Sequence, residues 1–440
     1  MGAPAGGGGA LQRVLVLVTV LVACGAGVFK AIGHAGPALF QVPRSAGPRD
    51  EAPRMQTSFI STRRGVFAHA ASLVETRDGR VRAFWYSGSR EGARDVEIRG
   101  AVLDPQSGQW SAERTVATRE ATQRSLRRFV SKLGNPVAAR GADGTLWLFY
   151  VTVSVGGWAG SSITAISSKD EGETWSAARR LVTSPFFNLS TLVKGTPFLY
   201  ADGSLGLPVY HEFIGKFGEI LRVDGSGAVL DKARLSHGRF SLQPVVLVKT
   251  RSEALALMRY AGSESPRRVI VASTRDAGAH WTPPEKSSLS NPDSALSGAV
   301  MSDGAILLAL NDVEHDRDVL SLAVSRDGGV RWSAVRDLEN QQGDRAAPLD
   351  QSRYASSVAA LARDSGAAPA DALAIAESVK LRSCRSGRCG FQFSYPYLIQ
   401  AGGGDFHLAY TWNSAFIKHV RFNRAWLDRQ PEKSPDGRPH

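Results

Sequence analysis

A short pattern of Ser or Thr, Asp, Gly and Trp recurs along the chain and constrains the fold more than any other feature. It reads SSKDEGETWS at residues 167–176, STRDAGAHW at 273–281 and SRDGGVRWS at 325–333. The aspartates of the last two copies are 51 residues apart, and those of the first two are 106 apart, about twice that spacing. A repeat period of about 50 residues matches one supersecondary unit, so we expect a chain built from repeats.

Weaker copies of the pattern and short apolar segments complete the period. A turn at Asp224 lies midway between the first two copies, and LDPQSGQWS at 103–111 is a looser upstream copy. Between the turns run short segments rich in apolar and aromatic residues, which predict four strands in each unit. The sequence therefore predicts an all-β fold, a six-bladed β-propeller of four-stranded antiparallel blades, closed by pairing of 416–422 with 58–63.

The last unit is delayed by an Ala-rich segment. Between Trp332 and Phe391 the pattern changes to one that favours two short helices, which predicts a small helical insertion at about 342–390. Such an insertion is either a surface excursion or a flap over the central mouth of the propeller.

The two ends of the chain lie outside the repeats. Residues 1–32 contain the apolar run 14–29, shorter than the roughly 20 residues of a membrane span, and are expected to be a signal peptide or membrane anchor. Cys24 in LVAC also fits the lipid-modified cysteine of a lipoprotein. Residues 33–55 are predicted as a flexible linker, 56–425 as the propeller and 426–440 as a C-terminal tail. We expect an exported protein, periplasmic or in the cell envelope, that meets the membrane through its N-terminal segment.

Charge and cysteine content narrow the partners. The chain has 53 Lys and Arg against 41 Asp and Glu, a net charge of +12, but no block of five or six like charges. Nucleic acid is therefore not expected as a partner, whereas an acidic substrate suits the positive balance. Cys384 and Cys389 are expected to form a disulfide, because two thiols cannot supply the four ligands of a structural zinc site. No metal or other cofactor is expected.

The recurring pattern is the Asp box, and with its spacing the chain resembles the sialidase (neuraminidase) superfamily over about residues 58–425. A branch of predicted neuraminidases is similar in HAA at 69–71, SREG at 89–92, GNP at 134–136 and PVYHE at 208–212. The resemblance implies an exo-glycosidase, a hydrolase that acts on an acidic-sugar glycan. It also implies that the box residues are structural and lie on outer strands, away from the catalytic mouth. These residues are Asp170, Gly172, Trp175, Asp276, Gly278, Trp281, Asp327, Gly329 and Trp332.

The resemblance also assigns chemical roles. Members of the superfamily hold the substrate carboxylate with an arginine cluster, attack with a tyrosine and use an aspartate as acid/base. Matching positions imply Tyr395 as nucleophile and Asp95 as acid/base. The implied substrate-binding residues are Arg90, Arg259 and Arg317, together with the polar residues Asn135 and His211 near strand ends.

Two positions depart from the family pattern. His69 stands where the first arginine is expected, and Gln243 stands where a glutamate should activate the tyrosine. Because glutamine cannot take a proton, Glu212 is the candidate replacement. Three interpretations remain open: a sialidase-like hydrolase, a uronate-polysaccharide lyase or glycosidase with His69 or His211 as base, and a non-catalytic glycan-binding propeller.

Overall fold

The chain divides into two units, Met1–Ala38 and Leu39–His440, which are described separately. The computed structural model describes residues 8–32, 38–43, 45–47, 51–184, 188–213, 215–236, 238, 240–342, 349–385 and 387–429. The first unit holds α1 (Gly8–Ile32), with exposed apolar side chains from Val14 to Val22 and an exposed free thiol at Cys24. No helix of the described residues is both long enough and apolar enough to cross a membrane.

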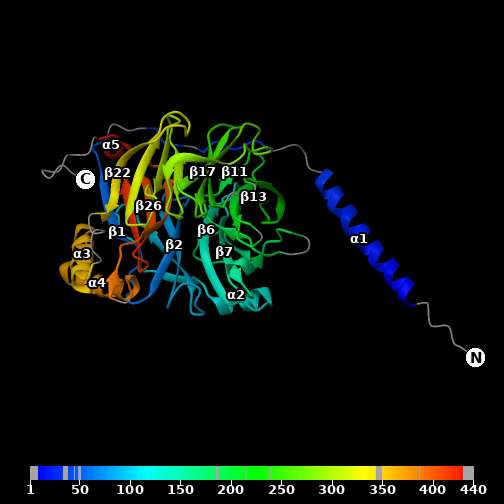
Figure 1. Ribbon diagram of the computed structural model, residues 1–440, viewed down its shortest axis with the longest axis horizontal. Coiled ribbons are helices and arrows are strands. Elements are labelled where there is room, and N and C mark those ends of the chain that lie inside the picture. The colour runs from blue at the N-terminus through cyan, green and yellow to red at the C-terminus, as the bar shows by residue number, and fades with distance from the viewer. Residues whose placement is uncertain are drawn as a thin grey trace, which may run out of the picture. The chain divides into compact units, whose positions relative to one another are not determined.

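The second unit confirms the predicted six-bladed propeller, in which each blade is an antiparallel sheet (Figure 1). The first strand of the third blade is split in two, and the last blade takes its fourth strand from the beginning of the propeller. The strands of each blade are given from first to fourth. Blade one consists of β2 (Phe67–Glu75), β3 (Val81–Gly88), β4 (Glu97–Leu103) and β5 (Arg114–Ala117), and blade two of β6 (Lys132–Arg140), β7 (Leu146–Val153), β8 (Ser161–Ser168) and β9 (Arg179–Arg180). Blade three consists of β10 (Leu192–Val193) with β11 (Phe198–Leu199), β12 (Leu205–His211), β13 (Phe217–Val223) and β14 (Val229–Arg234), and blade four of β15 (Ser241–Val248), β16 (Ala254–Tyr260), β17 (Arg268–Thr274) and β18 (Glu285–Ser290). Blade five consists of β19 (Ser297–Val300), β20 (Ile306–Leu310), β21 (Val319–Ser325) and β22 (Ser333–Asn340), and blade six of β25 (Phe393–Gln400), β26 (Phe406–Trp412), β27 (Phe416–Phe422) and β1 (Met55–Phe59).

The predicted closure of the ring is present. Strand β1 pairs with β27 from Met55 opposite Phe422 to Phe59 opposite Lys418, so the closing strand begins a few residues earlier than predicted. Because this pairing joins the two ends of the propeller sequence in one sheet, the last blade has four strands and backbone hydrogen bonds hold the ring closed.

The repeated topology gives the propeller two distinct ends. Loops that enter the first strand of a blade, or join its second and third strands, lie at one end, which we call the mouth end. Hairpins between first and second strands and between third and fourth strands lie at the other, the turn end. Figure 1 shows α2 (Arg119–Leu126) and the helices of the insertion at the lower edge, the mouth end, and α5 (Arg424–Asp428) at the upper edge.

All three recurring boxes form compact turns at the turn end. In the first, Asp170 Oδ1 accepts hydrogen bonds from Thr174 N at 2.9 Å and Ser168 Oγ at 2.7 Å. Gly172 has φ +90°, and a Cβ there would lie 3.2 Å from the Leu146 side chain. The same serine or threonine, aspartate and glycine bonds recur around Asp276 and Asp327. In each box the serine or threonine and the aspartate thus form hydrogen bonds within the turn, which makes the box a structural turn.

The tryptophans of the boxes are half-buried against neighbouring strands. Trp175 meets Phe84 edge to face at 5.6 Å, and Trp332 donates its indole N–H to Gly329 O at 3.1 Å. Trp175 and Trp332 also pack against the apolar clusters between neighbouring blades.

The predicted helical insertion consists of α3 (Gln351–Asp364), α4 (Pro369–Ser383) and a hairpin of β23 (Cys384–Arg385) and β24 (Arg388–Cys389), closed by the Cys384–Cys389 disulfide. Asp350 caps α3 by accepting from Ser352 N and Arg353 N. The helices bury Tyr354, Val358 and Val379 against the last two blades. The guanidinium of Arg382 on α4 donates to Ser89 O in the first blade, so the insertion packs beside the loop that follows β3.

Part of the predicted linker packs on the turn end. Phe40 is fully buried, its ring lies against Phe198 and Tyr200, and its N–H donates to Arg251 O at 2.8 Å. Farther along, Ser45 Oγ donates to Val300 O at 2.7 Å. The chain therefore enters the propeller at the end opposite its mouth.

Candidate active site

The first strands of the blades share an irregularity at the mouth end. Strands β2, β6, β15 and β25 each change register near their beginning, and one residue at each change has a positive φ. A bulge redirects a side chain, and a positive φ on a residue other than glycine costs about 1–3 kcal/mol and concentrates at functional sites. The four residues are Ala70, Asn135, Gln243 and Tyr395, with φ of 51°, 43°, 51° and 55°.

The remaining two blades carry the same feature just before their first strands. Ser190 precedes β10 with φ 59°, and Asp293 precedes β19 with φ 57°. All six blades thus place one strained residue around the mouth, and we take this ring as the candidate active site.

Tyr395 is the centre of the hydrogen-bond network in this ring. Its half-buried phenol oxygen lies 3.1 Å from Gln243 Nε2 and 3.3 Å from Arg259 Nη1, and both nitrogens donate to it. Arg259 Nη1 also donates to Gln243 Oε1 at 3.0 Å. Two N–H donors, one of them a guanidinium, therefore converge on one phenol oxygen.

The two predicted arginines of the fourth and fifth blades meet on one residue. Arg259 Nε forms an ion pair with Asp293 Oδ1 at 2.6 Å, and Arg317 Nη2 donates to the Asp293 carbonyl at 2.6 Å. Burial opposes the charge of Arg259, but Tyr395 and the Asp293 carboxylate outweigh it and raise the pKa of that guanidinium. Burial lowers the pKa of Arg317. The backbone of Arg317 accepts from Phe393 N at 2.7 Å, which links it to the strand of Tyr395.

His69 lies directly beside the nucleophile candidate. Its ring centroid is 4.2 Å from that of Tyr395, the residue is 6% exposed, and its buried Nδ1 has no partner among the described residues. Burial, with the charges of Arg317, Lys194 and Arg259, lowers the pKa of His69 to about 3. The ring is therefore neutral at physiological pH, and one of its buried polar atoms has no partner among the described residues.

The mouth also holds carboxyl groups in contrasting surroundings. Burial raises the pKa of Glu212, against the influence of Arg259, and its backbone N–H donates to Ser190 Oγ at 3.0 Å. Glu91 lies 3.4 Å from Tyr86 Oη, and its charge acts on Glu212 and Arg317.

Asp95 and Arg90 lie on the same loop but outside this network. The exposed Asp95 accepts from Ser89 N and Ser89 Oγ, both at 2.8 Å, and although burial opposes it, these bonds lower the pKa of Asp95. Arg90 is exposed and, with Asp95 and Lys132, lines a separate hollow of about 510 Å³. The structure therefore brings Tyr395, Gln243, Arg259, Arg317 and His69 together and leaves these two at the rim.

The two remaining predicted residues differ in position. Asn135 Nδ2 donates to Tyr210 Oη at 3.1 Å, and the same oxygen accepts from Gln243 at 3.3 Å, so Asn135 joins the network through Tyr210. His211 Nε2 instead pairs with Glu219 Oε2 at 2.7 Å, and its ring stacks on Phe217. It is held toward the third strand of its blade.

Four site residues were not predicted from the sequence: Glu91, Lys194, Tyr210 and Asp293. Three of the predicted ones carry a further signal, since Asn135, Gln243 and Tyr395 are each followed by proline within an apolar first strand. Because proline occurs within sheets only at edges and bulges, these pairs mark the redirected positions.

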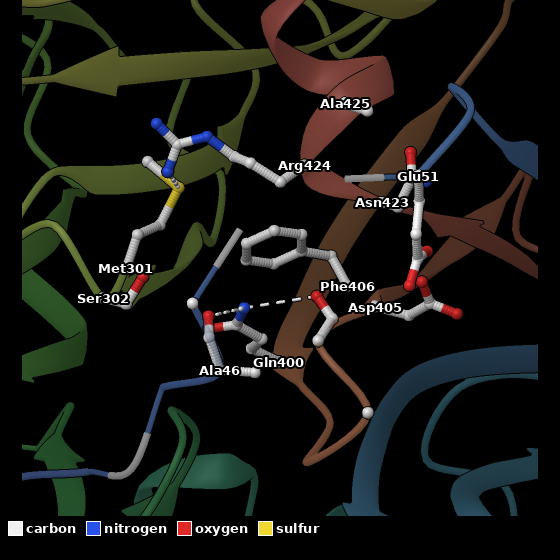
Figure 2. A pocket seen from close by; sticks show the side chains of 13 residues that line it. Ala46, Glu51, Met301, Ser302, Gln400, Asp405, Phe406, Asn423, Arg424 and Ala425 are labelled. Carbon is white, nitrogen blue, oxygen red and sulfur yellow. Dashed lines mark hydrogen bonds between the residues drawn. The ribbon is translucent and has the colours of Figure 1, made fainter. Parts of the chain in front are cut away.

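A hollow at the turn end lies apart from this site. The small hollow between the linker and the last blades measures about 20 Å³, enough for about one water. Figure 2 shows Arg424 reaching from α5 toward Met301 in this hollow, and Gln400 bonded across the loop to Gly404. Within the described ranges, no group of three or more His, Cys, Asp or Glu is placed to hold a metal ion.

Comparison with known proteins agrees with this architecture. A family model described as a BNR repeat-like domain matches residues 79–408. No curated protein matches the chain. Among solved structures, the Hadza microbial sialidase Hz136 is similar with TM-score 0.59 and 16% identity, over 81% of this chain and 65% of that one, so the chain spans less than two thirds of its length.

For two further solved structures, the match covers almost the whole length of the other protein. An intramolecular trans-sialidase from Ruminococcus gnavus, solved with oseltamivir carboxylate, gives TM-score 0.59 and 12% identity over 83% of this chain and 96% of that one. A protein of unknown function from Dyadobacter fermentans gives 0.60 and 11% over 84% and 98%. At such identities the likeness shows the shared propeller fold.

Proposed function

The chain belongs to the BNR repeat-like domain family, and from this membership and the mouth geometry we propose that it is a sialidase-like exo-glycosidase acting on an acidic-sugar glycan. The observation that carries the proposal is the contact of Tyr395 Oη with Arg259 and Gln243. A half-buried tyrosine that receives two N–H donors, beside two arginines, suits attack on a sugar that bears its own carboxylate. The sialidases among the structural relatives support the same reaction class.

Substrate binding rests on the arginine pair. Planar guanidinium groups bind a carboxylate through two parallel N–H bonds, and Arg259 and Arg317 both contact Asp293 from neighbouring blades. His69 takes the position of the first arginine in the family pattern. Because it is neutral, we expect it to contribute one hydrogen bond through Nδ1 rather than a charge.

The proposed reaction proceeds through a glycosyl-tyrosine. Tyr395 Oη bonds to the anomeric carbon as the bond from that carbon to the leaving oxygen breaks, and the leaving oxygen takes a proton from an acid. A water molecule, which gives a proton back to the same group, then displaces the tyrosine. A tyrosine serves better than a carboxylate as nucleophile because the substrate carboxylate would repel a second carboxylate.

Two groups complete the proton transfers. We infer that the acid that protonates the leaving oxygen lies on the loop after β3. On this loop the charge of Glu91 acts on Glu212 and Arg317, whereas Asp95 accepts hydrogen bonds from Ser89. We therefore assign the acid to Glu91 first and to Asp95 second. Gln243 cannot take the proton of Tyr395, whereas the raised pKa of Glu212 makes its carboxylate the better acceptor.

The alternative functions have less support. A lyase or glycosidase that uses a histidine base needs a ring that accepts a proton near neutral pH, but burial and three neighbouring cations lower the pKa of His69 to about 3. His211 is held by Glu219. A purely glycan-binding propeller would not require two donors on Tyr395.

The proposal extends to location and attachment. We propose that residues 1–32 export the chain or anchor it to the membrane, with Cys24 as a site of lipid attachment. The packing of Phe40 at the turn end supports this arrangement, because a tether there leaves the mouth accessible to a glycan.

The test is a substrate screen combined with trapping of the covalent intermediate. Purified full-length protein is assayed on aryl sialosides and on uronic-acid oligosaccharides, and then incubated with a fluorinated sialosyl fluoride. We expect sialoside cleavage and a mass increase on the peptide that contains Tyr395. Cleavage of uronate substrates with formation of an unsaturated sugar, or trapping on another residue, would overturn the assignment.

A further inference from the structure

A buried lysine beneath Tyr395 has no role in the mechanism above. Lys194 follows β10 directly and is 3% exposed. The one hydrogen bond of its ammonium is a long one, 3.5 Å to Pro396 O, and no carboxylate of the described residues lies within 4.0 Å. Buried charges are normally paired, because removal from water costs several kcal/mol for each ion.

A second buried lysine shows how the fold treats such a charge elsewhere. Lys418 in β27 is 5% exposed, and its ammonium forms an ion pair with Glu339 Oε1 at 2.7 Å, which Tyr410 Oη also contacts at 2.7 Å. By contrast, no carboxylate of the described residues pairs with Lys194, although such a partner would stabilise a buried ammonium.

Aromatic rings surround the Lys194 ammonium in place of a carboxylate. Nζ lies 4.9 Å from the centroid of the Tyr397 ring and 5.8 Å from that of Tyr395. A cation on the face of a ring is attracted by its electron density, and this attraction increases when a phenol becomes a phenolate. The unpaired cation is therefore placed where a tyrosinate would be its counter-ion.

We propose that Lys194 is a positioning residue that acts through Tyr395, supplying from beneath the ring the positive charge that stabilises the tyrosinate nucleophile. This inference rests on the proposed function, because it assigns the role of Lys194 to the same site. Tyr395 then has a donor pair at its oxygen and an ammonium below its ring. When its proton passes to Glu212, the negative charge that remains is neutralised locally.

The charge state of Lys194 gives the proposal a pH signature. The titratable and charged groups near it are His69 from β2, on which the charges of Arg259 and Arg317 also act, and Tyr395 and Tyr397 from β25. Burial lowers the pKa of Lys194 to about 7. Its ammonium is therefore present below neutrality and is lost as the pH rises, so the support for the tyrosinate decreases on the alkaline side.

The test compares Lys194→Met, Lys194→Arg and Tyr395→Phe in the full-length protein labelled at the tyrosine ζ-carbon. The Tyr395 resonance is assigned by its absence from Tyr395→Phe. We expect Lys194→Met to reduce the fraction of tyrosinate that the Tyr395 resonance reports below neutrality, where Lys194 of the native protein is charged. We expect kcat to fall about tenfold while KM changes little, since a stabilised nucleophile affects the chemical step. Lys194→Arg, which stays charged, should retain activity at alkaline pH where the native protein loses it.

The outcomes separate this inference from the proposed function. An unchanged Tyr395 titration in a folded Lys194→Met protein overturns the role of Lys194, even if Tyr395→Phe abolishes cleavage. A shifted titration supports it even if no sialoside is cleaved. Lys194→Met removes an unpaired buried charge, so it should fold, and a thermal melt checks this. Lys194→Gln provides a second uncharged variant.

Discussion

The two ends of the propeller hold their titratable side chains in opposite kinds of surroundings. At the turn end, the exposed Asp170 and Asp327 receive hydrogen bonds from their own turns, which lower the pKa of both carboxyls. At the mouth end, burial raises the pKa of Glu212, and His69 and Lys194 are buried with unsatisfied or weakly satisfied polar atoms. Groups that satisfy one another stabilise a fold, whereas groups left unsatisfied are available to a ligand. The regular repeat thus marks architecture, and the departures from it mark the chemistry.

The largest expected effect tests the mouth end directly. Tyr395→Phe removes one oxygen that accepts from Gln243 and Arg259, so we expect loss of kcat/KM by about a thousandfold or more with little change in melting temperature. The matched control is Tyr200→Phe, a buried tyrosine at the turn end, which should keep full activity. Comparable activity of Tyr395→Phe and the native protein would break the comparison.

The second effect concerns the acid at the rim of the mouth. We expect Glu91→Gln to lower kcat by about a hundredfold, within the range for removal of a general acid. Asp95→Asn should have a smaller effect, because that carboxylate is engaged by Ser89. An activated aryl leaving group, which needs no protonation, should restore much of the lost rate in the impaired variant. If Asp95→Asn is the more damaging change, the acid is Asp95, as the sequence resemblance implied.

The third effect concerns the arginine pair. Arg259→Lys keeps a positive charge but cannot bond at once to Tyr395, Gln243 and Asp293, so we expect kcat/KM to fall about tenfold to a hundredfold. Arg331→Lys changes an exposed arginine paired with Asp327 at the turn end and should leave kinetics unaltered. Steady-state assays of both variants on one sialoside provide the measurement.

The sequence predicted the fold and part of the site for different physical reasons. The boxes recur because each turn needs the same aspartate, glycine and tryptophan, so their spacing alone is enough to define the blades. Tyr395, Arg259 and Arg317 were assigned through the resemblance to sialidases, and the structure brings them together at one end of the propeller. Lys194 and Asp293 could not be assigned from the sequence, because their significance depends on packing between blades: Lys194 is notable only for the carboxylate it lacks, and Asp293 for the two arginines it receives.

Substitution of a glycine at the turn end should lower stability and leave catalysis unchanged, the opposite of the result expected at the mouth end. Gly329 has φ +101°, and a Cβ there would lie 2.4 Å from Leu255 Cδ2. Gly329→Ala should therefore lower the free energy of unfolding by about 1–3 kcal/mol, since both backbone strain and overlap oppose it. Because the box is remote from the mouth, kcat of the folded fraction should be unchanged. Denaturant unfolding and an assay at a temperature well below the transition test both parts.

The smallest effect is a pH dependence of stability at the strand that closes the ring. His419 in β27 lies opposite Ser58 of the closing strand β1. Its Nε2 lies 3.1 Å from Nδ1 of His407, and its Nδ1 accepts a hydrogen bond from the Trp110 indole N–H at 3.3 Å. Burial lowers the pKa of His407 to about 4 and that of His419 well below its usual value. Above pH of about 6.5 both rings are neutral in the folded and unfolded chain, so neither contributes a slope.

As the pH falls below that value, the unfolded chain takes up protons that the folded chain excludes, so the free energy of unfolding decreases down to about pH 4, where His407 also protonates in the fold. His407→Gln removes one of these groups and should flatten the decline of melting temperature between pH 6.5 and 4. A decline of the same slope in His407→Gln would assign acid sensitivity to other groups. Since His69 at the mouth is also held neutral by burial, a His69→Gln variant measured in parallel separates the contribution of the closing strand from that of the active site.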